Sequence, residues 1–148
     1  MPIFVTIDPR SRTIVENLTT GGDIKKHRTN ILSALSRHGA TVVRALEDVI
    51  TSGTRSGKVY SYKGRKYTAS APGEPPANRS GRLASSFGFK RTVNELSIFS
   101  KAFADNGYEY PWGLEMGNSR IKPRPYFVKT IQEKGVELKN ELYKMGVV

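Results

Sequence analysis

The sequence predicts an α+β domain in which an antiparallel sheet is covered by a long N-terminal helix and a C-terminal helix. Three observations support this fold class: a long amphipathic stretch near the N-terminus, short β-branched and aromatic runs separated by turns in the middle, and a second amphipathic stretch at the end. The order helix, strands, helix favours two helices packed on one face of a sheet. We expect residues 1–148 to form a single domain.

The N-terminal part begins with a strand and continues with the long helix. Residues 3–7 are β-branched or aromatic, and Pro9 ends this predicted strand. Asp23 is a favourable N-cap for a helix that Gly53 stops. The apolar residues recur at helical spacing, which indicates one buried face: Ile24, Ile31, Leu35, Val42, Leu46 and Val49, widened by Leu32, Val43 and Ile50. Polar residues fall mostly on the opposite face: Lys25, Thr29, Ser33, Arg37, Arg44, Glu47 and Asp48.

The middle of the chain alternates short strands with loops. Residues 58–68 hold two strand-like runs around Lys63-Gly64, which is typical of a β-hairpin. Prolines make 71–78 a loop, and Ser80 is expected to cap a short helical turn carrying Leu83 and Phe87. Further predicted elements are strands at 87–89 and 96–99 joined near Asn94, a short helix over 108–116, and a loop over 117–125.

A C-terminal helix is predicted from Tyr126 onward. Its apolar positions lie among lysines and glutamates: Phe127, Val128, Ile131, Val136, Leu138, Leu142 and Met145. Gly135 is the weak point of this helix, at a cost of about 1 kcal/mol.

Composition points to a polyanionic or acidic partner. The formal net charge is +11, and a basic surface favours nucleic acid, anionic lipid or an acidic protein face. The chain has no cysteine, so disulfides and Cys-ligated zinc are excluded. Residues 1–8 lack a signal-peptide pattern and no apolar run is long enough to span a bilayer, so we expect a soluble protein with no membrane partner.

Three patterns that resemble catalytic or metal sites do not satisfy the chemistry they would need. Residues 53–58 resemble a phosphate-binding loop, but the spacing is one residue short and Val59 replaces the magnesium-binding Ser/Thr. His27 and His38 share a helix face yet stand roughly 16 Å apart, too far for one metal. Glu109 and Glu115 flank an aromatic segment, and Glu115 is more simply interpreted as an ion-pair partner of a basic residue. We therefore expect no enzyme, no cofactor, no metal and no small-molecule substrate.

Residues 54–79 are interpreted as an arm that reaches a neighbouring subunit or DNA. The segment combines flanking glycines, a Tyr-rich hairpin and a proline stretch expected to remain extended. Its candidate contact residues are basic or aromatic: Arg55, Lys58, Tyr60, Tyr62, Lys63, Arg65, Lys66 and Tyr67. These residue types could also stack bases and contact phosphates, so a small basic nucleic-acid-binding protein is the alternative function.

Two motifs resemble a family of phage tail components typified by gene product 10 of phage HK97. The first is Pro75-Pro76-Ala77-Asn78-Arg79-Ser80-Gly81-Arg82-Leu83-Ala84-Ser85-Ser86, similar to the family's proline loop followed by Ser/Thr-Gly-x-Leu-x-x-Ser. The second is Tyr110-Pro111-Trp112-Gly113-Leu114-Glu115-Met116-Gly117 followed by Pro123-Arg124-Pro125-Tyr126-Phe127, similar to Tyr-x-x-x-x-Glu-x-Gly and Pro-x-Pro-Phe. In this chain Tyr126 precedes Phe127, whereas the family usually places the aromatic residue straight after proline.

The resemblance implies a scaffold role for the motif residues, which are Ser80, Gly81, Leu83, Trp112, Glu115, Gly117, Pro123, Pro125 and Phe127. It further implies a virion protein of the neck or tail, assembled in the cytoplasm of the host bacterium. The expected assembly is a ring of copies of this chain, a hexamer, that completes the tail and joins it to the head. The implied neighbours are a head-closure or adaptor protein, the tail terminator or tail tube protein, and the genomic DNA in the channel.

Overall fold

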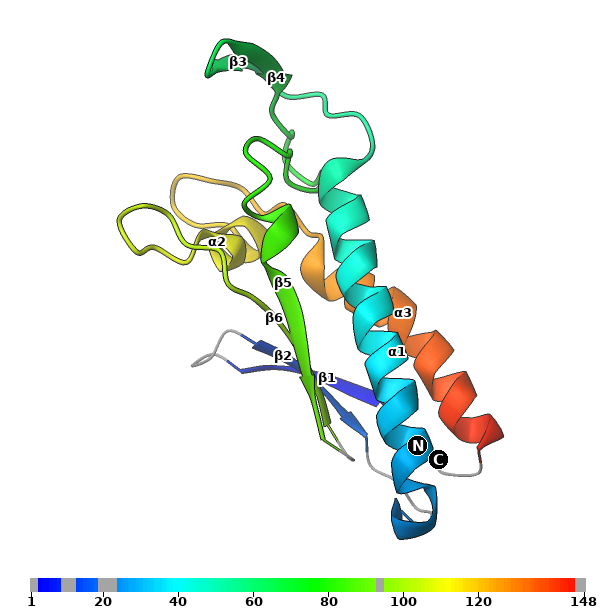
Figure 1. The fold of residues 1–148 in the computed structure, drawn as a ribbon. Helices are drawn as coiled ribbons and strands as arrows, with labels where there is room; N and C mark the ends of the chain where they lie inside the picture. Colours follow the sequence, from blue (N-terminus) through cyan, green and yellow to red (C-terminus); the bar gives the residue numbers. More distant parts are fainter. Residues whose placement is uncertain (1–2, 9–12, 19–23, 93–94, 146–148) are drawn as a thin grey trace. The chain divides into compact units, whose positions relative to one another are not determined.

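The chain has the predicted α+β fold, shown as a computed structural model in Figure 1. The structure describes residues 3–8, 13–18, 24–92 and 95–145, with side chains from residue 28 onward. Its elements are β1 (Ile3–Asp8), β2 (Thr13–Leu18), α1 (Ile24–Thr51), β3 (Val59–Tyr62), β4 (Arg65–Thr68), the 3₁₀ turn η1 (Ala84–Ser86), β5 (Phe87–Arg91), β6 (Glu95–Ser100), α2 (Tyr110–Met116) and α3 (Phe127–Lys144).

Contacts divide the chain into two compact units. The first, here called the sheet unit, comprises Met1–Arg44, Gly88–Phe99 and Thr130–Val148. The second, called the arm unit, comprises Ala45–Phe87 and Ser100–Lys129. The elements α1, β5, β6 and α3 each have residues in both units. The single domain expected for the whole chain stays a prediction.

The sheet unit contains a four-stranded sheet in the order β1-β2-β6-β5. The antiparallel β1–β2 pair aligns Ile3 with Leu18, and the antiparallel β2–β6 pair aligns Ile14 with Ile98. Strand β2 was not predicted, although its β-branched start (Thr13-Ile14-Val15) is a strand signal. The predicted stop at Pro9, cap at Asp23 and turn at Asn94 lie outside the described residues.

The apolar stripe predicted on the first helix is buried as expected. In the sheet unit, Ile31, Leu35 and Val42 have no exposed surface. The ring of Phe89 on β5 lies directly against α1 at Gly39, where a Cβ would meet a ring carbon at 2.5 Å. Any larger residue at this position would push the helix off the strand, so Gly39 sets how closely helix and sheet pack.

Helix α3 covers the same sheet face beside α1 (Figure 1). Its residues Ile131, Leu138 and Leu142 are buried, and an ion pair between Arg37 and Glu141 joins the two helices. The predicted core position Val136 is wrong, because this side chain is 60% exposed. The helical period places Val136 about 160° from Leu138, which explains why both cannot face the sheet.

One further expectation about α1 is confirmed, and His38 of the same helix is buried. Gly53 lies just beyond the last helical residue with φ +84°, the left-handed conformation that ends many helices.

No helix in the described part of the chain is both long and apolar enough to cross a bilayer.

Candidate subunit interface

The arm carries a β-hairpin, as predicted. Strands β3 and β4 pair antiparallel, with Tyr60 opposite Tyr67 and Tyr62 opposite Arg65. The two residues of the turn both have positive φ, +48° at Lys63 and +75° at Gly64. Two successive positive φ values define the type I′ turn, whose twist matches that of the flanking strands. Glycine suits the second position, and lysine at the first is less favourable than asparagine would be.

The tyrosines of the hairpin are engaged within the chain. Tyr60 and Tyr67 stack on each other, with ring centroids 5.8 Å apart and an interplanar angle of 26°. The Tyr62 ring is covered by cations: the Arg79 guanidinium lies 4.6 Å from its centroid and the Lys63 amine 5.6 Å. A base that stacked on Tyr62 would have to displace one of these cations. This arrangement counts against an open base-stacking platform.

Hydrogen bonds to Glu74 join Ser56 and Ala71 at the two ends of the hairpin, and we call these three residues the arm base. Its carboxylate accepts from the backbone N–H of Ser56 (3.1 Å), from the Ser56 hydroxyl, and from the backbone N–H of Ala71 (2.8 Å). These donors, the Ser56 hydroxyl foremost, lower the pKa of the Glu74 carboxyl from 4.5 to about 2. The proline stretch was expected to stay extended, but here it turns, because the Glu74 N–H also donates to the Ala71 carbonyl.

Arg55 differs from the other predicted contact residues of the arm. Its guanidinium donates to the carbonyls of Val49 (2.7 Å) and Pro76 (3.2 Å), so it fastens the arm to the end of α1. The basic residues left exposed on the hairpin are Lys58, Lys63, Arg65 and Lys66. Among the aromatic residues, Tyr62 and Tyr67 are half-buried and Tyr60 is 48% exposed.

The first motif forms a tight turn that leads into β5. Gly81 has φ +76°, and its N–H donates to the Asn78 side chain at 2.9 Å. Leu83 is buried and therefore occupies a core position. The helical turn starts later than expected: η1 begins at Ala84, and the Ser80 hydroxyl accepts only a long bond from the Arg82 N–H (3.4 Å).

The second motif contains a buried carboxylate with a role that was not predicted. Glu115 accepts the backbone N–H groups of Tyr126 (2.8 Å), Phe127 (2.9 Å) and Val128 (3.1 Å). These are the N–H groups at the start of α3, which have no partner inside the helix. The interpretation of Glu115 as an ion-pair partner of a basic residue is therefore wrong. Its negative charge caps α3 and interacts favourably with the helix dipole.

Aromatic side chains surround this cap. Phe87, Tyr126 and Phe127 pack against one another, with centroids 5.9 to 6.2 Å apart. Burial, together with the nearby charge of Glu115, raises the pKa of the Tyr126 phenol. Its hydroxyl donates to the carbonyl of Pro111 in α2, and Trp112 of the same helix is half-buried. The Phe127 aromatic position of the second motif is thus a core position.

The segment that follows α2 is attached directly to the arm. Gly117 ends the helix with φ +73°, and Pro123 lies so close that a Cβ at Gly117 would meet it at 2.7 Å. The Pro123 carbonyl accepts the N–H of Gly73 in the arm at 3.1 Å. The Arg124 guanidinium donates to the Ser70 hydroxyl (2.6 Å) and carbonyl (2.9 Å), whereas Pro125 is exposed.

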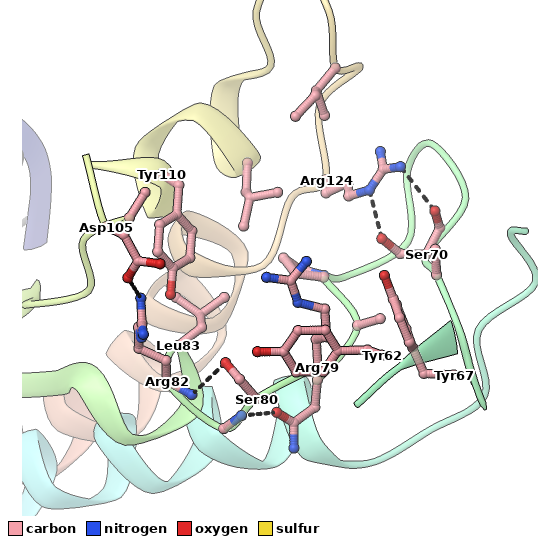
Figure 2. Close-up of a pocket in the computed structure, with 18 residues that line it drawn as sticks. Tyr62, Tyr67, Ser70, Arg79, Ser80, Arg82, Leu83, Asp105, Tyr110 and Arg124 are labelled. Atoms are coloured by element: carbon pink, nitrogen blue, oxygen red, sulfur yellow. Dashed lines mark hydrogen bonds and ion pairs between the residues drawn. The ribbon is translucent and has the colours of Figure 1, made fainter. Parts of the chain in front are cut away.

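Between the arm and α2 lies a hollow of about 550 Å³, entirely within the arm unit. Figure 2 shows Tyr62 and Tyr67 on one side of it and Asp105 and Tyr110 on the other. Its charged lining residues are Arg79, Arg82, Asp105 and Arg124. A smaller hollow of about 390 Å³ shares Tyr62, Tyr67, Arg79 and Ser80 with it and adds Lys63 and Arg65.

The cations in the hollow are not equivalent. Arg82 forms an ion pair with Asp105 at 2.9 Å, and this hydrogen bond raises the pKa of the Arg82 guanidinium. Arg124 is held by Ser70, whereas Arg79 contacts the Tyr62 ring. Sequence reasoning did not select Arg79, Arg82, Asp105 or Glu74 individually. The charged residues lie in loops without periodicity, so nothing local indicated that they would converge.

The role of Glu74 predicts a defined pH dependence for the arm base. Because its pKa is about 2 in the folded chain and 4.5 in the unfolded chain, its stabilisation is complete above pH 4.5 and is lost as the pH falls towards 2. Carbon-detected NMR should give a Glu74 carboxyl midpoint near 2, and Ser56→Ala should raise it. Glu74→Gln should abolish the acid-induced loosening of the Ser56 and Ala71 amides. A Glu74 midpoint near 4.5 would contradict this account of the arm base.

Within the described residues, no cluster of three or more His, Asp or Glu side chains is placed to hold a metal ion. The geometry gathers the two sequence motifs, the hairpin and a basic hollow into one unit. The chain was compared with protein-family models, with curated proteins and with solved structures, and no match was found in any of the three.

Proposed function

We propose that this chain is a structural subunit of a tailed phage that forms a ring in the neck, completes the tail and joins it to the head. One observation supports this proposal most. Both motifs of the phage-family resemblance contribute to the base of the arm: Pro76 accepts from Arg55, and the Pro123-Arg124 pair bonds Gly73 and Ser70. The residues that carry the resemblance thus hold a basic hairpin in a fixed position.

A fixed base with an exposed tip suits a subunit that reaches a neighbour. Ordering a backbone residue costs about 1–2 kcal/mol of conformational entropy. At the arm base, the hydrogen bonds of Arg55, Glu74 and Arg124 offset part of this cost before assembly. The two-stranded hairpin itself is too small to be more than marginally stable alone. Burial of Val59 and Tyr60 against a neighbour would stabilise it. The proposed neighbours are copies of this chain, a head-closure or adaptor protein, and the tail terminator or tail tube protein.

A small basic nucleic-acid-binding protein is the second candidate. The observation that favours it is the run of exposed cations on the hairpin, namely Lys58, Lys63, Arg65 and Lys66, with no acidic residue between them. The cations that already cover Tyr62 favour the first candidate, because they occupy a ring that base stacking would need. In the neck the same cations would face acidic neighbours or the DNA in the channel.

Quantitative mass spectrometry of purified phage particles tests the proposal. The chain is expected in mature particles at the copy number of one ring, about six per particle for the cyclic assembly proposed. The major capsid protein provides the internal standard, and an abundant intracellular protein of the infected cell provides the contamination control. Absence from mature particles, with the chain abundant in infected cells, would overturn the neck function and favour a free nucleic-acid-binding protein.

A further inference from the structure

The arm unit is divided into a basic and an acidic segment. Residues 49–73 carry five basic residues and no acidic one: Arg55, Lys58, Lys63, Arg65 and Lys66. Residues 102–119 carry Asp105, Glu109 and Glu115 and no lysine or arginine. Because the chain has a net charge of +11, a segment of this length without lysine or arginine is unusual within it. Glu115 is buried under α3, so the surface charge of the acidic segment comes from Asp105 and Glu109.

Both segments also expose large apolar side chains. On the hairpin, Val59 is 64% and Tyr60 48% exposed. On the acidic segment, Phe103 is 45%, Tyr108 46% and Met116 53% exposed. Apolar area of this kind beside opposite charges is typical of a surface that binds another protein.

The acidic segment is a preformed surface. The Ala104 N–H donates to the Tyr108 carbonyl at 2.8 Å, and the Gly107 N–H donates back to Ala104 at 2.9 Å. The Tyr108 ring lies on α2 at Gly113, where a Cβ would meet its hydroxyl at 2.5 Å. Met116 follows Gly113 by three residues and therefore neighbours it on the helix surface. We call Phe103, Asp105, Tyr108, Glu109 and Met116 the acidic face, and residues 58–68 the arm tip.

We propose that the arm tip of one copy docks on the acidic face of the next copy. The inference rests on the proposed ring, because it names the surface that receives the arm. Within one copy, Tyr62 and Tyr67 of the arm tip and Asp105 of the acidic face lie on opposite sides of the hollow (Figure 2). Val59 of the arm tip and Phe103, Tyr108 and Met116 of the acidic face are exposed. A contact between two different surfaces of identical chains is heterologous, and its repetition closes a ring when the rotation allows it.

The chemistry of the two surfaces is complementary. The register places Val59, Ser61 and Lys66 on one face of the hairpin, since Val59 pairs with Thr68 and Ser61 with Lys66. On this face Val59 supplies apolar area for Phe103 and Tyr108, and Lys66 faces the Asp105 carboxylate. That carboxylate is 95% exposed and keeps accepting capacity beside its bond to Arg82. Copies of charge +11 repel at long range, but a Debye length of about 8 Å at physiological salt leaves the short-range contact intact.

Thiol cross-linking tests this contact cleanly because the chain contains no cysteine. Ser61→Cys places one thiol on the arm tip and Asn106→Cys places one beside the acidic face, both at exposed positions. A short bis-maleimide added to an equimolar mixture at millimolar protein should give a Ser61→Cys–Asn106→Cys dimer, at least about tenfold above either variant alone. The doubly substituted chain should give a ladder of oligomers.

Charge reversal supplies the specificity control. Arg65→Glu with Lys66→Glu on the arm-tip partner should lower the cross-link yield roughly tenfold, the effect of 1.4 kcal/mol. Asp105→Lys with Glu109→Lys on the other partner should restore much of the yield. The matched control is Lys129→Glu with Lys139→Glu, which changes the net charge equally at two exposed sites of α3 and should not lower the yield.

The outcomes are distinct. Dominant linking between two Ser61→Cys chains, linking only within one doubly substituted chain, or no linking at all would each overturn the inference. So would protection of the arm-tip thiol by a DNA oligonucleotide without any link between copies, which would make the arm tip a nucleic-acid surface. If mass spectrometry finds the chain in particles at ring stoichiometry but these cross-links do not form, the docking inference is overturned and the neck function is not. If the cross-links form but the chain is absent from particles, the neck function fails instead.

Discussion

Replacing Glu115 with alanine should destabilise the protein by about 3–5 kcal/mol, the largest single-residue effect that we expect. The substitution leaves the backbone N–H groups of Tyr126, Phe127 and Val128 without their acceptor, and the first two belong to buried residues. Each unsatisfied buried donor costs about 1–3 kcal/mol, and three such costs in one place are not fully additive. Urea unfolding of the full chain, followed by circular dichroism, measures the loss.

Two companion variants separate capping from mere removal of charge. Glu115→Gln keeps one carbonyl acceptor and the shape of the side chain, so its loss should be smaller, about 1–3 kcal/mol. Glu137→Ala removes an exposed carboxylate of α3 that pairs with Lys134 at 3.1 Å, and should cost less than about 1 kcal/mol. Equal losses for Glu115→Ala and Glu137→Ala would show that Glu115 does not cap α3.

Shortening the arm should separate folding from assembly. Lys58 and Ala69 are adjacent in the hairpin ladder, since the Ala69 N–H donates to the Lys58 carbonyl at 2.9 Å. Residues 59–68 can therefore be replaced by Asn-Gly, which closes a two-residue turn between them. The anchors Arg55, Glu74 and Arg124 all lie outside the deleted part, so the shortened monomer should stay folded, with a Tm within a few degrees of the wild type.

A conservative variant of the same turn provides the matched control. Lys63→Asn keeps the full hairpin and places asparagine at a position with φ +48°, which asparagine tolerates better than lysine does. This variant should fold like the wild type and should still assemble, because Val59 and Lys66, which meet the acidic face, are kept. Loss of assembly in Lys63→Asn would mean that the turn lysine itself, and not the hairpin as a whole, contacts the neighbour.

Elements with a strong local pattern were predictable from the sequence. The α1 stripe of Ile31, Leu35 and Val42 has a clear helical period, and these residues are fully buried. The hairpin was predicted from Lys63-Gly64 between two tyrosine-containing runs, and its turn lies at those residues. Such signals are local because they arise from the backbone preferences of neighbouring residues.

Features that depend on distant partners were not predictable in the same way. Strand β2 pairs with β1, its neighbour in sequence, and with β6, far along the chain, and the pairing with β6 has no local signal in the sequence. The role of Glu115 depends on α3 beginning beside it, eleven residues from Tyr126. The Glu74 bonds and the Arg124–Ser70 contact likewise join loops that have no periodic signal. The contacts of the arm base could therefore be recognised only in the folded structure.

The particle produced with the shortened arm tests the central claim most directly. Phage carrying the Asn-Gly replacement of residues 59–68 would be grown beside the wild type and the Lys63→Asn variant, and electron microscopy would count joined and unjoined particles. The proposed neck function predicts filled heads and free tails for the shortened arm, with joined particles in both controls. Joined, infectious particles that contain the shortened chain would contradict it.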